Sequence, residues 1–190
     1  MNTIEKLATE VTERTIELSG NSLIDTLKDE YKSWYFRRPV FIDAPTGTGK
    51  TTFVYEELIP NAIKENKTVL LVNNRRILSA QQKLAILNLI RTLQPDSVKD
   101  IPLDIDSADL EKHAFFGPVC VTTYQGLHSL INNTSSMITL PSDLYDWFHR
   151  LKYAVFDEIH FLYSDALFNP YCGGLLSIFL MSSKMSFGYI

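Results

Sequence analysis

From residue 39 onward, short apolar runs alternate with segments of helical periodicity, and this alternation constrains the fold more than any other feature. The first two runs are PVFIDA (39–44) and TVLLVN (68–73), and helical patterns follow them over about 50–66 and 77–93. Both runs are apolar throughout rather than at alternate positions, as in strands that are buried on both faces. The pattern predicts βαβ units in an α/β fold: three layers, with helices on both faces of a mostly parallel sheet.

The second half of the chain continues the pattern after an interruption. The stretch 94–113 contains prolines and many acidic residues, so we expect an excursion over the surface, with at most a short edge element. Further strands are predicted at PVCVTTY (118–124), YAVFD (153–157) and LLSIFLM (175–181), and a short helix capped by Ser142 is predicted over 141–151.

The N-terminal part has a different pattern. Over residues 3–35, apolar residues recur at intervals of three and four, which predicts two amphipathic helices broken near SGN (19–21). The cluster WYF (34–36), followed by two arginines and Pro39, marks a boundary because proline restricts the preceding residue to extended conformations. We therefore expect a helical extension over 1–35 and one main domain over 36–190.

Charge and composition exclude several classes of protein. The 190 residues include 18 Lys and Arg against 22 Asp and Glu, a net charge of −4, so the molecule is not a polycation that coats nucleic acid. Cys120 and Cys172 lie far apart, with no ligand spacing for zinc and no disulfide framework. Without a secretory signal, or an apolar run of the roughly 18 residues that a membrane helix needs, we expect a cytoplasmic protein that does not contact membranes.

The segment APTGTGKTT (44–52) lies between a predicted strand and a predicted helix, the context of a phosphate-binding loop. Glycines let backbone N–H groups turn toward an anion, and the N-terminus of the helix adds its positive dipole end. Lys50 is expected on the β- and γ-phosphates and Thr51 on Mg²⁺. Ala44 replaces the first glycine of GxxxxGK[ST], and the alternative is a Gly/Thr turn that only caps a helix. The predicted nucleotide-binding residues are Thr46, Gly47, Thr48, Gly49, Lys50, Thr51 and Thr52.

The strand YAVFD ends in an acid, Asp157, and a second acid, Glu158, follows it. In parallel α/β sheets, ligands bind at the carboxyl ends of the strands, which is where Asp157 is placed. If this strand neighbours PVFIDA, Asp157 faces the metal held by Thr51, and Glu158 is placed to polarise the water that attacks the γ-phosphate. The alternative is an acidic pair that only caps a helix.

Together, APTGTGKTT and DEIH (157–160) resemble motifs I and II of the superfamily 2 helicases, in particular of the DExH-box group. The resemblance implies the first RecA-like motor domain of a P-loop NTPase, with ATP and Mg²⁺ as ligands. It also implies that Asp157 assists Mg²⁺, that Glu158 activates water, and that His160 links the nucleotide site to a second motor domain. It covers about residues 36–184.

Three weaker matches follow the family's order. LLVNNRRILSAQQ (70–82) resembles motif Ia, with Asn73 and Asn74 in place of the usual Pro-Thr type of residue, and VTTYQGL (121–127) resembles the motif Ib region. Both motifs imply contacts with a nucleic-acid backbone. The alternatives are a solvated helix start and ordinary polarity at a strand end. IFLMSSK (178–184) lies where the family has an apolar strand ending in Ser-Ala-Thr, and Ser182 with Ser183 resembles a degenerate form of that third motif. The implied nucleic-acid contacts are Arg75, Arg76, Thr122, Thr123 and Gln125.

The resemblance implies an ATP-hydrolysing helicase or translocase that acts on DNA or RNA. Motors of this family use a second RecA-like domain that supplies arginine fingers, and the 190 residues leave no room for it, so we expect it in a longer chain or in trans. The isolated chain should therefore bind ATP with Mg²⁺ and hydrolyse it slowly. Two alternatives stay open: a nucleotide-gated binding or regulatory module, and the motor half of a restriction or repair translocase.

Overall fold

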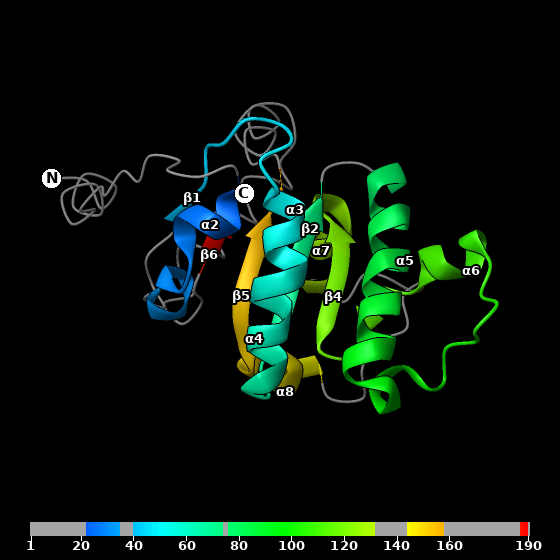
Figure 1. Cartoon of the computed structure of the whole chain (residues 1–190). Helices are drawn as coiled ribbons and strands as arrows, with labels where there is room; N and C mark the ends of the chain where they lie inside the picture. The colour runs from blue at the N-terminus through cyan, green and yellow to red at the C-terminus, as the bar shows by residue number, and fades with distance from the viewer. Residues whose placement is uncertain (1–21, 35–39, 74–75, 132–143, 158–186, 190) are drawn as a thin grey trace, which may run out of the picture.

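The central feature of the molecule is a twisted sheet, described here from a computed structural model that places residues 22–34, 40–73, 76–131, 144–157 and 187–189 (Figure 1). Within these ranges the sheet has six strands in the order β1-β6-β5-β2-β4-β3. The first five strands in this order run parallel, and β3 pairs antiparallel with β4 at one edge. The strands are β1 (Val40–Phe41), β2 (Thr68–Asn73), β3 (Phe115–Phe116), β4 (Val119–Thr123), β5 (Leu151–Phe156) and β6 (Phe187–Tyr189). The predicted mostly parallel α/β sheet is confirmed.

Strand β2 lies at the centre and has the bounds that the sequence predicts. All six of its residues are buried, because β4 and β5 flank it and helices cover both of its faces. Its side chains alternate between two cores: Val69 and Leu71 face one, whereas Leu70 and Val72 face the other. This two-sided burial explains why the strand is apolar throughout.

Helices cover both faces, as predicted, so the molecule has three layers (Figure 1). On one face lie α3 (Lys50–Phe53), η2 (Val54–Leu58), α4 (Ile59–Lys64) and α5 (Arg76–Leu93). On the other face α7 (Tyr124–Ile131) and α8 (Leu144–His149) bury Leu127, Leu130 and Trp147. The predicted cap of α8, Ser142, lies outside the described residues.

The helix predicted over 50–66 is present but irregular, because its middle part, η2, is π-helical. This widened turn comes shortly before Pro60, the second residue of α4. A proline ring has no N–H to donate and collides with the carbonyl four residues earlier in a regular α-helix, so a wider turn relieves the clash.

The outer strands differ most from the prediction. Of the described residues 40–44, only Val40 and Phe41 pair in the sheet, and the chain then leaves β1 for the loop. The expectation that YAVFD neighbours PVFIDA is wrong, because β6 lies between β1 and β5. β6 was not predicted, since three residues are too few for a periodic signal. The strand predicted at 175–181 lies outside the described residues, as do Ser182 and Ser183.

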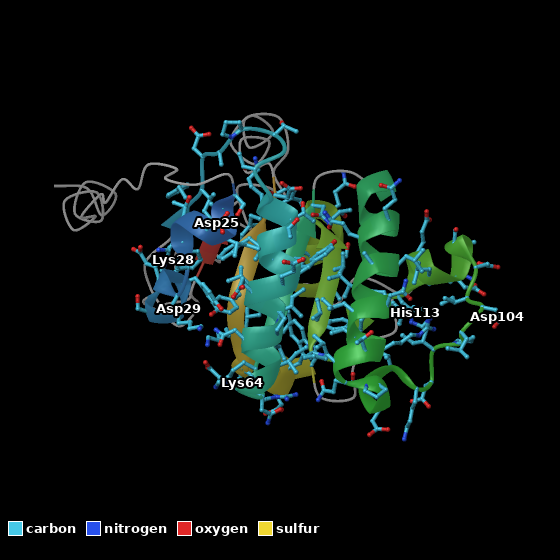
Figure 2. All side chains as sticks on the ribbon, viewed as in Figure 1. Asp25, Lys28, Asp29, Lys64, Asp104 and His113 are labelled. Atoms are coloured by element: carbon cyan, nitrogen blue, oxygen red, sulfur yellow. The ribbon has the colours of Figure 1, made fainter. Side chains whose placement is uncertain are left out.

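The acidic stretch 94–113 runs over the surface as predicted, with Asp104 on its outer side (Figure 2). It contains a short 3-10 turn, η3 (Pro95–Val98), and a helix, α6 (Ser107–Lys112), that the sequence pattern did not predict. The side chains of Val98 and Leu110 are buried in the main core and anchor the stretch.

The described part of the N-terminal segment is short and folded against the main domain. It consists of α2 (Leu23–Leu27) and a 3-10 turn, η1 (Glu30–Ser33). Leu23, Leu27 and Tyr31, which follow one another at intervals of four, are buried in the same core as Phe53 of α3. The other predicted N-terminal helix lies outside the described residues. Over the described ranges, no helix combines the length and the apolar character needed to span a membrane.

Candidate active site

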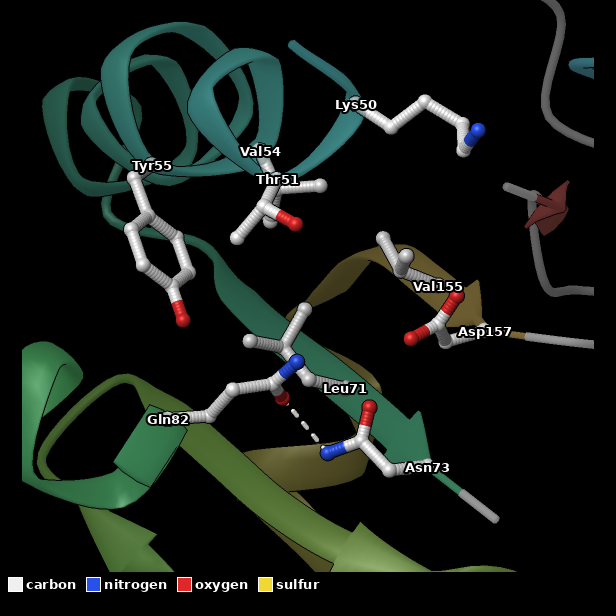
Figure 3. Close-up of a pocket in the computed structure, with 9 residues that line it drawn as sticks. All are labelled: Lys50, Thr51, Val54, Tyr55, Leu71, Asn73, Gln82, Val155 and Asp157. Carbon is white, nitrogen blue, oxygen red and sulfur yellow. Dashed lines mark hydrogen bonds between the residues drawn. The ribbon is translucent and has the colours of Figure 1, made fainter. Parts of the chain in front are cut away.

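A pocket of about 60 Å³ opens at the carboxyl ends of β2 and β5, beside the start of α3 (Figure 3). At roughly 15 Å³ for each water, this volume holds about four water molecules. The walls combine a cation, a carboxylate, hydroxyls and amides with aliphatic side chains. The lining residues are Lys50, Thr51, Val54, Tyr55, Leu71, Asn73, Gln82, Val155 and Asp157.

The loop before α3 has the backbone that its two glycines predict. Gly47 and Gly49 adopt φ angles of +88° and +84°, in the left-handed region that other residues rarely enter. Gly49 caps α3, since its carbonyl accepts from Phe53 N at 2.8 Å. The Thr48 hydroxyl donates to the Pro45 carbonyl at 2.8 Å and closes the turn. The loop is therefore held by its own backbone and by residues within it.

Lys50 lies over this loop. Its ammonium donates to the carbonyl of Ala44 at 2.5 Å and to that of Pro45 at 3.2 Å. Ala44 is not among the residues with positive φ, so the position does not require the glycine that the motif usually has there. The replacement of this glycine thus has a conformational explanation.

Thr51 and Asp157 converge on the pocket although they are far apart in sequence. Figure 3 shows the Thr51 hydroxyl directed toward the side of the pocket on which the Asp157 carboxylate lies. Asp157 follows β5, and its N–H donates to the carbonyl of Val72 in β2 at 2.9 Å. The sheet thus positions Asp157. Glu158 and His160 lie outside the described residues.

Tyr124, the first residue of α7, supports Asp157 from the carboxyl end of β4, which lies on the far side of β2 from β5. Its hydroxyl donates to the Asp157 carbonyl at 3.0 Å, and its ring stacks on Phe156 with centroids 6.1 Å apart. Tyr124 is buried and comes directly after the last residue of β4. Tyr124 was not predicted as a site residue; the available signal in the sequence was its place at the end of a predicted strand, on the edge where Asp157 was expected.

An amide pair and a tyrosine complete the pocket wall, and neither was assigned to the site from the sequence. Asn73, at the end of β2, is only 3% exposed, and its Nδ2 donates to Gln82 Oε1 of α5 at 2.6 Å. Tyr55 projects from η2 into the same space. Burial, and secondly the charge of Asp157, raise the pKa of Tyr55 to about 12, so its hydroxyl stays protonated at neutral pH.

Three of the residues predicted to contact nucleic acid, Thr122, Thr123 and Gln125, lie at or just after the end of β4. Thr122 is buried, and the Thr123 hydroxyl accepts from Gly126 N at 3.1 Å, inside the first turn of α7. Gln125 is exposed on the same turn. Arg75 and the side chain of Arg76 lie outside the described residues. The two threonines thus have local structural roles, while Gln125 is accessible.

The N-terminal segment contacts the loop directly. Leu23 N donates to the carbonyl of Thr48 at 2.9 Å. The rings of Tyr31 and Trp34 meet Phe53 edge to face, at centroid distances of 5.4 and 6.0 Å. The Tyr31 hydroxyl also donates to a Glu57 carboxylate oxygen at 2.6 Å. Trp34, the first residue of the WYF cluster, therefore packs against the helix that follows the loop.

Comparisons with known proteins found a matching family and a similar solved structure. The model of the family described as DEAD/DEAH box helicase matches residues 28–184. No curated protein matches the chain. Among solved structures, the crystal structure of the UvsW helicase from bacteriophage T4 is similar, with 16% sequence identity and a TM-score of 0.47. That similarity covers 97% of this chain and 57% of the UvsW chain, so the present chain spans little more than half the length of that helicase.

Proposed function

Because this chain belongs to the DEAD/DEAH box helicase family, we propose that residues 36–190 are the ATP-binding first motor domain of a superfamily 2 helicase or translocase of the DExH type. One observation carries the proposal: Lys50, Thr51 and Asp157 line a single pocket. A loop that only capped a helix would have no reason to face a carboxylate from a distant strand. Residues 1–35 are proposed as a helical extension of this domain.

The loop would bind the triphosphate of ATP. The N-terminus of α3 and the two left-handed glycines provide backbone donors and a positive dipole end for an anion. Lys50 would exchange the carbonyls of Ala44 and Pro45 for the β- and γ-phosphate oxygens. The expected binding set is the one predicted from the sequence, residues 46–52.

The residues present also fit Mg²⁺. Thr51 offers a hydroxyl and Asp157 a carboxylate, the oxygen ligands that Mg²⁺ prefers, and the ion takes most of its remaining ligands from phosphates and water. When bound with ATP, Mg²⁺ neutralises the charge that develops on the phosphate oxygens. Glu158 is proposed as the base that orients the attacking water, and His160 as the link to a second motor domain.

Hydrolysis is proposed to need a second RecA-like domain, in the same polypeptide or in trans. An arginine finger supplied by such a partner contributes roughly 10³ to 10⁵ in rate in related chemistry. Nucleic acid, DNA or RNA, is the proposed substrate, contacted by Arg75, Arg76, Thr122, Thr123 and Gln125. The proposed setting is the cytoplasm.

The test compares ATP binding by the 190-residue chain and by Lys50→Met, using calorimetry with Mg²⁺ present. Loss of a charge-assisted contact of about 1.5–3 kcal/mol should weaken binding about 10- to 150-fold. Lys64→Met is the matched control, because Lys64 is exposed at the far end of α4 (Figure 2). Equal affinities for the wild type and Lys50→Met would refute the proposed ATP site.

Turnover is then titrated with single-stranded DNA and RNA at two salt concentrations. We expect slow hydrolysis by the chain alone and stronger stimulation after a second motor domain is added. Salt should weaken any response to nucleic acid, since binding to phosphates releases counterions. Fast, nucleic-acid-stimulated turnover by the isolated chain would contradict the need for a second domain. ATP binding without any effect of nucleic acid, even with a second domain present, would favour the regulatory module instead.

A further inference from the structure

The amide of Asn73 is a buried polar group that the proposed function leaves unused. Its Nδ2 is satisfied by Gln82 Oε1 at 2.6 Å, yet no residue in the described part of the chain donates to its Oδ1. The side chain is only 3% exposed, and a buried acceptor without a donor is costly. Figure 3 shows this oxygen on the side of Asn73 that faces Asp157 across the pocket.

Strand register explains why the two residues share the pocket. β2 and β5 are adjacent and parallel, with Val72 opposite Phe156. Asn73 and Asp157 are the next residue on each strand, and the bond from Asp157 N to the Val72 carbonyl extends the ladder to this point. An amide oxygen and a carboxylate therefore border the same space of about 60 Å³.

The chemistry of this space identifies what Asn73 would contact. The Oδ1 atom of Asn73 is an acceptor, so the partner that it lacks must be a hydrogen-bond donor. Lys50 is the cation in the pocket wall, but its ammonium donates to the carbonyls of Ala44 and Pro45. The space holds about four waters, and Mg²⁺ usually keeps several of its own waters when it binds to proteins. Water polarised by a divalent cation is a strong donor.

We propose that Asn73 Oδ1 accepts a hydrogen bond from the water shell of the Mg²⁺ that Thr51 and Asp157 would hold, and that Gln82 is the positioning residue for this contact. By accepting from Nδ2, Gln82 fixes the amide with its oxygen toward the pocket. The inference rests on the proposed function, because it requires Mg²⁺ with ATP at this site. It assigns a role to a residue at which the motif Ia segment departs from its usual pattern.

A purely structural role is the competing explanation, since the same amide pair ties β2 to α5. Mg²⁺ dependence separates the two roles. If the amide pair only holds β2 against α5, its loss would change the stability of the fold and leave the Mg²⁺ requirement of nucleotide binding unchanged. If Asn73 accepts from a water bound to Mg²⁺, its loss would change that requirement.

The experiment measures ATP affinity by calorimetry, first with EDTA and then over a Mg²⁺ series, and Mn²⁺ binding in the presence of ATP by electron paramagnetic resonance. Loss of a hydrogen bond to a ligand of the metal typically costs 10- to 100-fold in metal affinity, so Asn73→Leu should raise the half-saturating Mg²⁺ concentration about 10-fold. Asn73→Asp keeps an oxygen acceptor and should stay within about threefold of the wild type. Affinity in EDTA should be the same for all three proteins.

Gln82 provides a second, independent pair of variants. Gln82→Leu frees the Asn73 amide to turn and should raise the half-saturating Mg²⁺ concentration by a few-fold. Gln81→Leu is the matched control, because Gln81 is the exposed neighbour on the same helix. If Asn73→Leu fails to fold by circular dichroism, the comparison of Gln82→Leu with Gln81→Leu decides.

The outcomes are distinguishable. If wild-type binding of ATP does not respond to Mg²⁺, the proposed metal site fails and the inference fails with it. If the wild type responds and the folded Asn73 and Gln82 variants share its half-saturating concentration, the inference alone is overturned and the pair is a structural tie. A selective shift in Asn73→Leu and Gln82→Leu supports it.

Discussion

The pocket has two sides that are built differently. The loop side consists of residues 44–53 and is held mainly by contacts within itself, such as those from Thr48 and Lys50 to nearby carbonyls. The edge side consists of the carboxyl ends of β2 and β5, which are far apart in sequence, and it is supported by Tyr124, just after the end of β4. There the bonds are long-range: Asp157 N to Val72 O, and the Tyr124 hydroxyl to Asp157 O.

The difference shows that local sequence positions the residues of the loop side, whereas the tertiary fold positions those of the edge side. A short loop can specify its own conformation, because glycines and a helix N-terminus act locally. The edge side depends on the strand order β5-β2-β4, which brings three segments to one line. Substitutions that disturb the packing of the sheet should therefore displace the residues of the edge side. The loop side should lose its conformation only when the helix that follows it is destabilised.

The largest expected effect tests whether the loop side is as independent as its local contacts suggest. Phe53, fully buried at the end of α3, packs against Tyr31 and Trp34. Phe53→Ala should lower the free energy of unfolding by about 3–5 kcal/mol, through lost burial and a cavity. Urea denaturation followed by circular dichroism measures it.

Glu56→Ala is the control, because Glu56 is exposed on the next turn and the change should stay within about 0.5 kcal/mol. If Phe53→Ala does not fold, Phe53→Leu should still show a smaller loss of the same sign. A Phe53→Ala protein within about 1 kcal/mol of the wild type would mean that the N-terminal segment does not support the loop.

The same contrast explains what the sequence could predict. β2 and the loop before α3 were located from consecutive residues, because their signals are local: a continuous apolar run, and glycines before a lysine. The presence of Asp157 in the pocket was predicted for an incorrect reason, since β6 separates β5 from β1. Parallel strands still align their carboxyl ends across an intervening strand, so the conclusion did not depend on direct pairing.

The rest of the site could not be predicted from the sequence, because it depends on hydrogen bonds between side chains and distant segments. Nothing local to Tyr124 shows that its hydroxyl will meet the Asp157 carbonyl, and nothing local to Asn73 shows that Gln82 will fix its amide. Likewise, the acidic stretch 94–113 gave no sign that Val98 and Leu110 would join the core. Side-chain partners become visible only once strand order and helix placement are known.

A medium effect is expected when one bond on the edge side is removed. Tyr124→Phe deletes the donor to the Asp157 carbonyl and should lower the free energy of unfolding by about 0.5–1.5 kcal/mol. It should also weaken binding of ATP with Mg²⁺ a few-fold, because Asp157 loses a support. Urea denaturation and calorimetry on the same samples give both values.

Tyr153→Phe is the matched control, since its hydroxyl accepts from Asn61 Nδ2 at 2.7 Å and it does not line the pocket. We expect a similar loss of stability without a change in nucleotide affinity. If both variants left nucleotide affinity unchanged, the edge side would not need the bond from Tyr124.

The smallest expected effect tests whether the two sides face one another. Tyr55 projects from the helix on the loop side, and its pKa is raised from 10.0 to about 12 by burial and secondly by the charge of Asp157. A raised pKa means that the folded state holds this proton more tightly, so the associated stability is complete below pH 10 and is lost as the pH rises toward 12.

Asp157→Asn removes the charge and should lower the pKa of Tyr55 by the smaller part of its shift. Tyrosinate absorbance, titrated for the wild type and Asp157→Asn with Tyr55→Phe subtracted, measures this change. An unchanged pKa would mean that the carboxylate of Asp157 does not act on Tyr55, and the two sides would then not form one site.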